Sequence, residues 1–205
     1  MKRSALLLLS ILIMAIPSCK QKAPSAIDTI MTRASIRSFT GEPVCREQLE
    51  TILKAGMAAP SAINIQPWRF VVLTERERID AIFGEGRRGE MFRSAGAVIV
   101  VCGQTVALRK PFGKPDALEE EWENIFWHED CSAAAENILL AAHALGLGAV
   151  WTAGYPAEDR YKPVAEALGL PKDVLPLCII PIGVPAENPA PKDKWKPDNI
   201  HWEEW

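Results

Sequence analysis

Hydrophobic and polar positions along the chain follow two different periods. Apolar residues three and four positions apart, such as Leu49, Ile52 and Leu53, predict a helix over residues 45–59 that Pro60 ends. The same spacing predicts further helices over residues 26–33, 75–84, 118–145 and 158–170. Continuous apolar runs predict strands over residues 69–74, 96–102, 149–154 and 176–185. Such runs are typical of strands that are covered on both faces of a sheet.

The arrangement of these elements predicts the fold class. Helices and strands mix without regular alternation, which indicates an α+β domain with a buried sheet between helices. The segments 34–43 and 104–118 lack a period and are predicted to be irregular. The tail over residues 187–205 is rich in proline and charge and carries three tryptophans. We expect this tail to be an arm that lies on a surface, with its rings buried and its backbone solvated.

Bulk properties narrow the class of protein. The chain has 205 residues, a formal net charge of −3 and 48% hydrophobic residues. This length and composition predict one globular domain with a substantial core. The mild acidity gives no reason to expect nucleic acid as a partner.

The first residues predict a targeting segment. An apolar run of 15 residues, Ser4 to Ser18, follows a basic start, and it is shorter than the roughly 20 residues that span a bilayer as a helix. It ends in "IPSC", which resembles the lipobox of bacterial lipoproteins, where Cys19 would be lipidated. The expected organisation is a signal peptide over 1–18, a tether over 19–25 and a domain over 26–205. The protein would then be exported and lipid-anchored to a bacterial membrane, on the periplasmic or outer-membrane face. A plain secretory signal or a non-cleaved anchor are the alternatives.

Cysteine and histidine residues give little indication of chemistry of their own. We expect the four remaining cysteines to be buried thiols, although an exported protein could oxidise two of them: Cys45, Cys102, Cys131 and Cys178. The three histidines, His128, His143 and His201, are too scattered along the chain to predict a metal site.

Three polar clusters stand out against the hydrophobic pattern. Arg33, Ser35 and Arg37 form a candidate anion site, because the planar guanidinium donors match phosphate. The loop "APSAINIQPWRF", over residues 59–70, carries a hydroxyl and two carboxamides between two prolines. A third cluster, residues 192–194, places two lysines in the tail. Each cluster alone also fits solvated side chains or surface ion pairs.

Taken together, four segments of the chain resemble the nitroreductase family of FMN-dependent oxidoreductases. They are "TRASIRSF", "APSAINIQPWRFVVL", "HEDCSAAAENILLAAHALGLGAVWTAGYP" and "IPIGVPAENPAPKDK". The resemblance extends from about Ile27 over nearly the whole remaining chain, and the proline-containing loop is its most specific part. It implies a nitroreductase-like fold with a central, mostly antiparallel sheet flanked by helices. It also implies a homodimer that binds FMN at shared sites.

The resemblance also implies a role for each cluster. Arg33 would grip the phosphate with help from Ser35, and Arg37 would lie near the pyrimidine end of the flavin. Lys192 and Lys194 would complete the phosphate site. The loop would contact the flavin of the partner subunit through Pro60, Ser61, Ala62, Asn64 and Gln66. Within the predicted strand 149–154, the backbone around Trp151, Thr152, Ala153 and Gly154 would pass the flavin ring near its reactive nitrogen. Ala34 and Ala62 replace residues that are often polar in the family, and would contribute backbone contacts.

The implied chemistry is a ping-pong cycle that needs no catalytic side chain. A reduced nicotinamide, NAD(P)H, would reduce the flavin, and a small planar acceptor such as a nitro compound or a quinone would then be reduced. Reductive dehalogenation and flavin destruction also occur in the family. The alternative from another class is a non-catalytic flavin-binding or ligand-binding lipoprotein on the same scaffold. Trp122 and Trp127 would form either a stacking wall for the acceptor or buried hydrophobic surface. Arg87 and Arg88 are not assigned a role in flavin binding.

Overall fold

The structure is a computed structural model that describes residues 25–86 and 88–205. The expected signal peptide, the tether up to residue 24, the lipidation site Cys19 and Arg87 lie outside the described residues. Within the described part, no helix combines the length and the apolar character that crossing a bilayer requires.

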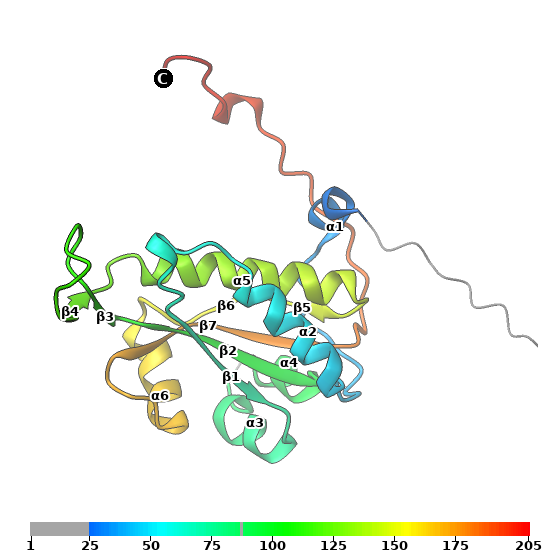
Figure 1. Ribbon diagram of the computed structural model, residues 1–205. Coiled ribbons are helices and arrows are strands. Elements are labelled where there is room, and N and C mark those ends of the chain that lie inside the picture. The colour runs from blue at the N-terminus through cyan, green and yellow to red at the C-terminus, as the bar shows by residue number, and fades with distance from the viewer. Residues whose placement is uncertain (1–24, 87) are drawn as a thin grey trace, which may run out of the picture.

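A five-stranded antiparallel sheet forms the centre of the domain (Figure 1). Strand order is β1-β2-β7-β5, and β6 also pairs with β7. The strands are β1 (Trp68–Leu73), β2 (Ala97–Gln104), β5 (Gly148–Ala149), β6 (Thr152–Ala153) and β7 (Val174–Gly183). Val100 of β2 lies opposite Val71 on one side and Ile179 on the other. The mostly antiparallel sheet and the strands predicted over 69–74, 96–102 and 176–185 are therefore confirmed, whereas the strand predicted over 149–154 is divided into β5 and β6.

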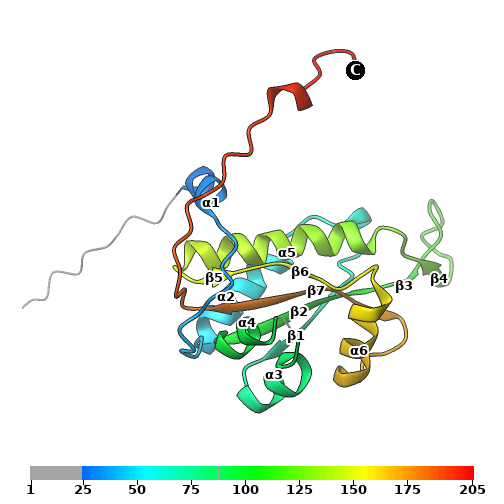
Figure 2. The same ribbon diagram turned by 180° about the vertical axis from the view of Figure 1, so that it is seen from behind.

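Helices cover both faces of this sheet (Figures 1 and 2). Two helices pack on one face, α2 (Arg46–Met57) and α5 (Trp127–Ala144). The other face is covered by α3 (Arg76–Phe83), α4 (Gly89–Ser94) and α6 (Glu158–Leu168). Because successive strand residues point to opposite faces, Ile179 joins one hydrophobic core and Ile180 the other. This confirms the α+β prediction.

The alanine-rich part of α5 lies in the core, against α2. Ala134 and Ile138 of α5 are fully buried. A Cβ added to Gly56 of α2 would lie 2.9 Å from the Ile138 side chain, so the two helices approach closely there. Asn137 Nδ2 donates a hydrogen bond of 3.0 Å to the Ala55 carbonyl and fixes their register.

The region before α5 differs from the prediction. The long helix was expected to begin near residue 118, but α5 begins at Trp127, and the segment expected to be irregular contains a hairpin of β3 (Val106–Arg109) and β4 (Glu120–Glu123). The Arg109 guanidinium lies 4.3 Å from the Trp122 ring centre across this hairpin. Asn124 then stops the strand, because its backbone N–H donates to Thr105 and its side chain accepts the Phe126 N–H. These cross-strand contacts outweigh the helical spacing of the apolar residues.

The tail also differs from the prediction. It passes α1 (Ala26–Thr32), contains the short helix η2 (Pro197–Asn199) and projects away from the domain (Figures 1 and 2). Trp195, Trp202 and Trp205 are 72%, 81% and 100% exposed. The expectation that these rings are buried is therefore wrong for the single chain, because no part of the described domain reaches them.

Candidate functional site

The first cluster is held in place by the edge of the sheet. Helix α1 starts with a capping box at Ser25 and ends before Arg33, so the chain leaves the helix at this arginine. The Ile36 N–H then donates to the Ala149 carbonyl at 3.1 Å, and Ser35 forms a parallel bridge with Ala149 of β5. Residues 35 and 36 therefore run parallel to β5, which leads into the segment that contains Trp151. This pairing fixes Arg33 and Arg37 on either side of the bridge.

The tail returns to the same place and brings the predicted lysines with it. The Ala186 N–H donates to the Ser38 carbonyl, so the tail begins beside the first cluster. A pocket of about 220 Å³ is lined by residues from both ends of the domain: Arg33, Ala34, Ser35, Arg37, Pro189, Ala190, Lys192 and Lys194. Four cationic side chains and a hydroxyl in one pocket are suited to a phosphate dianion. The pocket therefore fits the phosphate of FMN.

Neighbouring carboxylates contact the side chain of Arg33 and the backbone of Arg37. Glu136 of α5 lies 3.4 Å from Arg33 Nε, and the Arg33 side chain is only 17% exposed. The terminal nitrogens of Arg33 make no hydrogen bond within the described part of the chain. Glu187 accepts hydrogen bonds from the backbone N–H groups of Arg37 and Ser38. Arg33 can therefore present its two outer nitrogens to a ligand in the pocket.

His143 supports the same region from α5. Its Nε2 lies 2.9 Å from Thr32 Oγ1, and the Thr32 hydroxyl lies 2.6 Å from the Asp28 carbonyl. Because the hydroxyl donates to that carbonyl, the His143 Nε2–H donates to Thr32. Burial, and after it the positive charge of Arg33, lower the pKa of His143, so the neutral ring is favoured.

The proline-containing loop has a strained backbone. It contains the short helix η1 (Ala62–Asn64), and Ile63, Asn64 and Gln66 have φ angles of 44°, 59° and 55°. Ser61 Oγ accepts the Gln66 N–H at 3.0 Å, and Asn64 Oδ1 accepts from Gln66 Nε2 at 3.2 Å. The predicted polar side chains thus hydrogen-bond within the loop and define its shape.

This loop and the cationic pocket lie at opposite ends of α5 (Figures 1 and 2). The Ala62 N–H donates to Asp130 in the first turn of α5, whereas Thr32 beside the pocket contacts His143 in its last turn. With a rise of 1.5 Å per residue, Asp130 and His143 are roughly 20 Å apart along the helix axis. Within one chain, the structure brings Arg33, Arg37, Lys192 and Lys194 together but does not add the loop to them.

The segment Trp151–Gly154 forms part of a second pocket. The Thr152 hydroxyl donates to the Ile179 carbonyl at 2.6 Å, and the Gly154 N–H donates to Leu177 at 3.0 Å. A Cβ at Gly154 would lie 2.8 Å from the Pro176 carbonyl oxygen, so only glycine allows this close approach. Thr152 and Ala153 line a pocket of about 460 Å³ between α3, α4 and α6. Residues that the sequence did not assign also line it: Phe83, Arg88 and Arg160.

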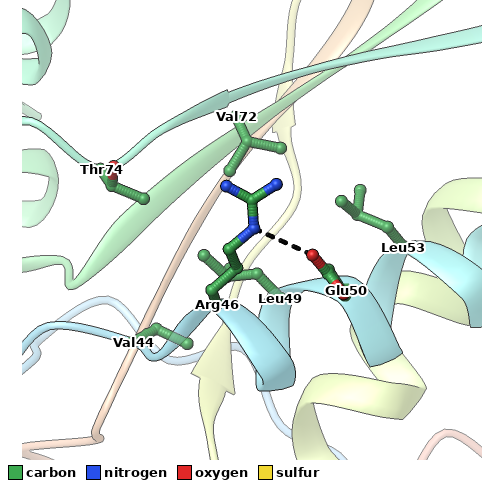
Figure 3. Close-up of a pocket in the computed structure, with 7 residues that line it drawn as sticks. All are labelled: Val44, Arg46, Leu49, Glu50, Leu53, Val72 and Thr74. Atoms are coloured by element: carbon green, nitrogen blue, oxygen red, sulfur yellow. Dashed lines mark hydrogen bonds and ion pairs between the residues drawn. The ribbon is translucent and has the colours of Figure 1, made fainter.

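Another groove contains none of the predicted site residues. It measures about 400 Å³, lies between α2 and β1 (Figure 3), and is lined by Val44, Arg46, Leu49, Glu50, Leu53, Val72 and Thr74. Arg46 Nε and Glu50 Oε1 form an ion pair of 2.9 Å within it. Arg46 is the one cation among these lining residues and Glu50 offsets its charge, whereas the pocket beside β5 gathers four cations.

The remaining candidate residues have structural roles. Trp127 is 6% exposed and packs on Tyr155 with ring centres 4.8 Å apart, so it is buried hydrophobic surface rather than a stacking wall. Burial raises the pKa of the Cys102 and Cys131 thiols to about 12, and Cys178 is also buried. Cys45 is exposed, contrary to the prediction, because it precedes α2 at the surface. Residues 25–86 and 88–205 contain no group of three potential metal ligands.

Comparison with known proteins gives consistent matches. The model of the nitroreductase family matches residues 30–86 and 83–184. A protein of Methanothermobacter thermautotrophicus, assigned as an NADH dehydrogenase/NAD(P)H nitroreductase, is 42% identical over 87% of this chain and 87% of its own. A crystal structure from Bacteroides thetaiotaomicron with the same assignment has a TM-score of 0.76 at 39% identity, and covers 88% of this chain and 98% of that one. The structure of a protein assigned as a nitroreductase from Desulfovibrio desulfuricans, in complex with FMN, has a TM-score of 0.71 at 31% identity, with coverages of 89% and 98%.

Proposed function

Because the chain belongs to the nitroreductase family, we propose that it is an FMN-dependent oxidoreductase. It takes electrons from a reduced nicotinamide and passes them to nitro compounds, quinones or similar electron-poor acceptors in a ping-pong cycle. The observation that carries this proposal is the convergence of Arg33, Arg37, Lys192 and Lys194 on one pocket beside β5. The similarity to an NAD(P)H nitroreductase and to a protein crystallised with FMN supports it.

Each predicted residue then has a defined task. Arg33, Lys192 and Lys194 bind the phosphate, and the Ser35 hydroxyl adds a neutral hydrogen bond. Arg37 places a positive charge toward the pyrimidine end, where it offsets negative charge in the reduced cofactor. Bound FMN supplies the hydride-transfer chemistry, so the protein needs no side-chain nucleophile, acid or base.

The remaining contacts come from backbone and from a second copy of the chain. Hydrogen bonds to β7 fix the position of the segment over residues 151–154, so that its backbone can border the flavin ring. The strained loop is remote from the cationic pocket of its own chain, so we propose that it closes the pocket of the partner in a homodimer. Pro60 and Pro67 limit the loop's freedom, which lowers the ordering cost of binding.

Absorption spectra of the purified domain test the function directly. We expect a yellow protein whose flavin absorbance disappears when NADH or NADPH is added without oxygen and returns when a quinone or a nitro compound is supplied. The titration also establishes which nicotinamide is preferred. Colourless protein that cannot be reconstituted with FMN would contradict the proposal.

The N-terminal sequence favours a second candidate function. A lipoprotein anchored through Cys19 would work outside the cytoplasm, where free NADPH is not an obvious reductant, and it could bind a flavin or another ligand without turnover. Fold alone does not exclude this, since one scaffold can serve several functions. Bound FMN that no electron source and acceptor can cycle would favour it. Incorporation of labelled fatty acid into the wild-type chain but not into Cys19→Ser tests the anchor itself.

A further inference from the structure

The loop over residues 60–67 has a strained backbone, and its internal hydrogen bonds are supplemented by a contact from α5. Ile63, Asn64 and Gln66 all have φ angles between 44° and 59°, and none of them is glycine. A left-handed conformation is sterically unfavourable for a residue that carries a Cβ atom. Ile63 is 65% exposed, so its side chain does not recover this cost by packing in the core. Besides the hydrogen bonds within the loop, a contact from outside it therefore helps to hold this shape.

Asp130 of α5 provides such a contact. Its Oδ1 accepts the Ala62 N–H at 2.9 Å, across a separation of 68 residues in the sequence. Asp130 is 6% exposed, and within the described residues its Oδ2 has no hydrogen-bond partner. A buried carboxylate with an unsatisfied oxygen is unfavourable for folding. The protein therefore retains Asp130 at a cost in stability.

The carboxylate is held on a rigid support. The Asp130 N–H donates to the Phe126 carbonyl in the first turn of α5, where the helix dipole favours negative charge. The Phe126 N–H in turn donates to the Asn124 side chain, and the Asn124 N–H donates to Thr105 at the base of the β3–β4 hairpin. Helix, hairpin and loop thus meet at one point, and the position of Asp130 sets the position of Ala62.

We infer that Asp130 is a positioning residue that presets this loop for the flavin of the partner subunit. The inference rests on the proposed function, because the loop is then a surface used in binding rather than a connection. Holding the loop in its strained shape before the cofactor arrives removes an ordering cost from binding. Without the Asp130 acceptor, the loop relaxes toward ordinary backbone angles and the cofactor must reorder it.

Asp130→Ala, compared with wild type and with Glu129→Ala, tests this role. Glu129 is the adjacent carboxylate in the same helical turn, its side chain is 61% exposed, and its Oε2 lies 3.3 Å from His128 Nδ1. We expect Asp130→Ala to weaken FMN binding to the apoprotein at least tenfold, and to accelerate hydrogen exchange of the Ala62 amide at least tenfold. Glu129→Ala should leave both quantities within twofold of wild type. Unchanged FMN affinity or unchanged Ala62 exchange in Asp130→Ala would overturn the inference.

A second substitution separates loop strain from a general loss of stability. Glycine adopts positive φ angles without a steric penalty, so Ile63→Gly in the Asp130→Ala background should recover at least threefold of the lost FMN affinity. Ordinary destabilisation would not be repaired by glycine at an exposed position, and absence of recovery would overturn the strain explanation. Wild-type protein that binds no FMN would overturn the proposed function, whereas Ala62 exchange in apoprotein would still show whether Asp130 anchors the loop.

Discussion

Arg33 shows how one neighbour can decide which atoms of a side chain face a ligand. The Glu136 carboxylate lies beside Nε, so the ion pair uses the inner edge of the guanidinium. The outer edge carries the two nitrogens that can form paired hydrogen bonds with a phosphate. A lysine at this position would offer a point charge without a fixed direction. The pocket therefore depends on an arginine together with its acidic neighbour.

Replacing Arg33 should affect ligands with a phosphate only. Hydrogen bonds to charged groups contribute about 1.5–3 kcal/mol, so Arg33→Ala should weaken FMN binding by about 10- to 100-fold. Riboflavin, which lacks the phosphate, should bind with unchanged affinity. Arg46→Ala is the control, because Arg46 pairs with Glu50 in the groove of Figure 3. Equal losses for FMN and riboflavin would contradict the assignment of the pocket to phosphate.

His143 should make stability depend on pH. Its pKa in the folded protein lies below the ordinary value of 6.5 because of burial and Arg33, so the unfolded chain binds the proton more readily. Stability is then complete above about pH 6.5 and falls as the pH drops below it. His143→Gln should reduce this fall, whereas His201→Gln in the exposed tail should not. Urea unfolding between pH 7.5 and 5 measures the free energy of unfolding of the wild type and of both variants. An equal fall of this free energy in all three proteins would refute the role of His143.

At the scale of elements, the sequence pattern predicts regular segments well and the hairpin poorly. Helices α2, α3 and α6 and the three longest strands appear where their periods place them. Leu118, Trp122 and Phe126 are spaced four apart like one face of a helix, but Trp122 lies opposite Ala107 in a strand pair. This pairing depends on a partner 15 residues away, which a local period cannot reveal.

The same limit applies to the candidate site. The convergence of four cations on one pocket could be predicted, because they lie in recognisable segments: Arg33, Arg37, Lys192 and Lys194. Arg88 could not be assigned, because only the packing of α4 against the sheet at β7 places it in the pocket with Thr152. Asp130 was missed for a similar reason. Its hydrogen bond joins a helix to a distant loop, and a single acidic residue in the first turn of a helix is common.

Packing between β2 and α5 predicts a strong effect at Gly103. A Cβ at this position would overlap the Trp127 ring and lie 2.9 Å from Cys131 Sγ. Overpacking of this kind costs about 1–3 kcal/mol, so Gly103→Ala should lower the free energy of unfolding by that amount in urea titrations. The double variant with Trp127→Leu should be less destabilised than the sum of the two single changes. Strict additivity would argue against this contact.

At the scale of the whole molecule, the tail leaves its large apolar side chains exposed in the single chain. Trp195, Trp202 and Trp205 place three large rings in solvent on an arm that leaves the domain. Large apolar surfaces of this kind mark interaction sites in soluble proteins. The homodimer proposed above gives the arm a surface on which to lie, and would bury the rings as the sequence pattern suggests.

Removal of residues 195–205 tests this arrangement. The truncated chain keeps Lys192 and Lys194, so its own cationic pocket is retained. We expect its dimer to dissociate at concentrations where the full chain remains dimeric, as measured by sedimentation. Tryptophan emission of the full chain should also shift to longer wavelength on dilution. A truncated dimer as stable as the full one would show that the arm does not pack on the partner.

The origin of the cationic pocket from both ends of the domain has a consequence for biosynthesis. Arg33 is among the first residues of the domain to leave the ribosome, and Lys194 is added 161 residues later. In sequence order, the sheet and the buried residues of both cores end at Gly183, before either lysine of the pocket is added. Under the proposed function, a protease that removes the tail before Lys192 would leave the sheet and both cores in place but take away two of the four cations for the phosphate.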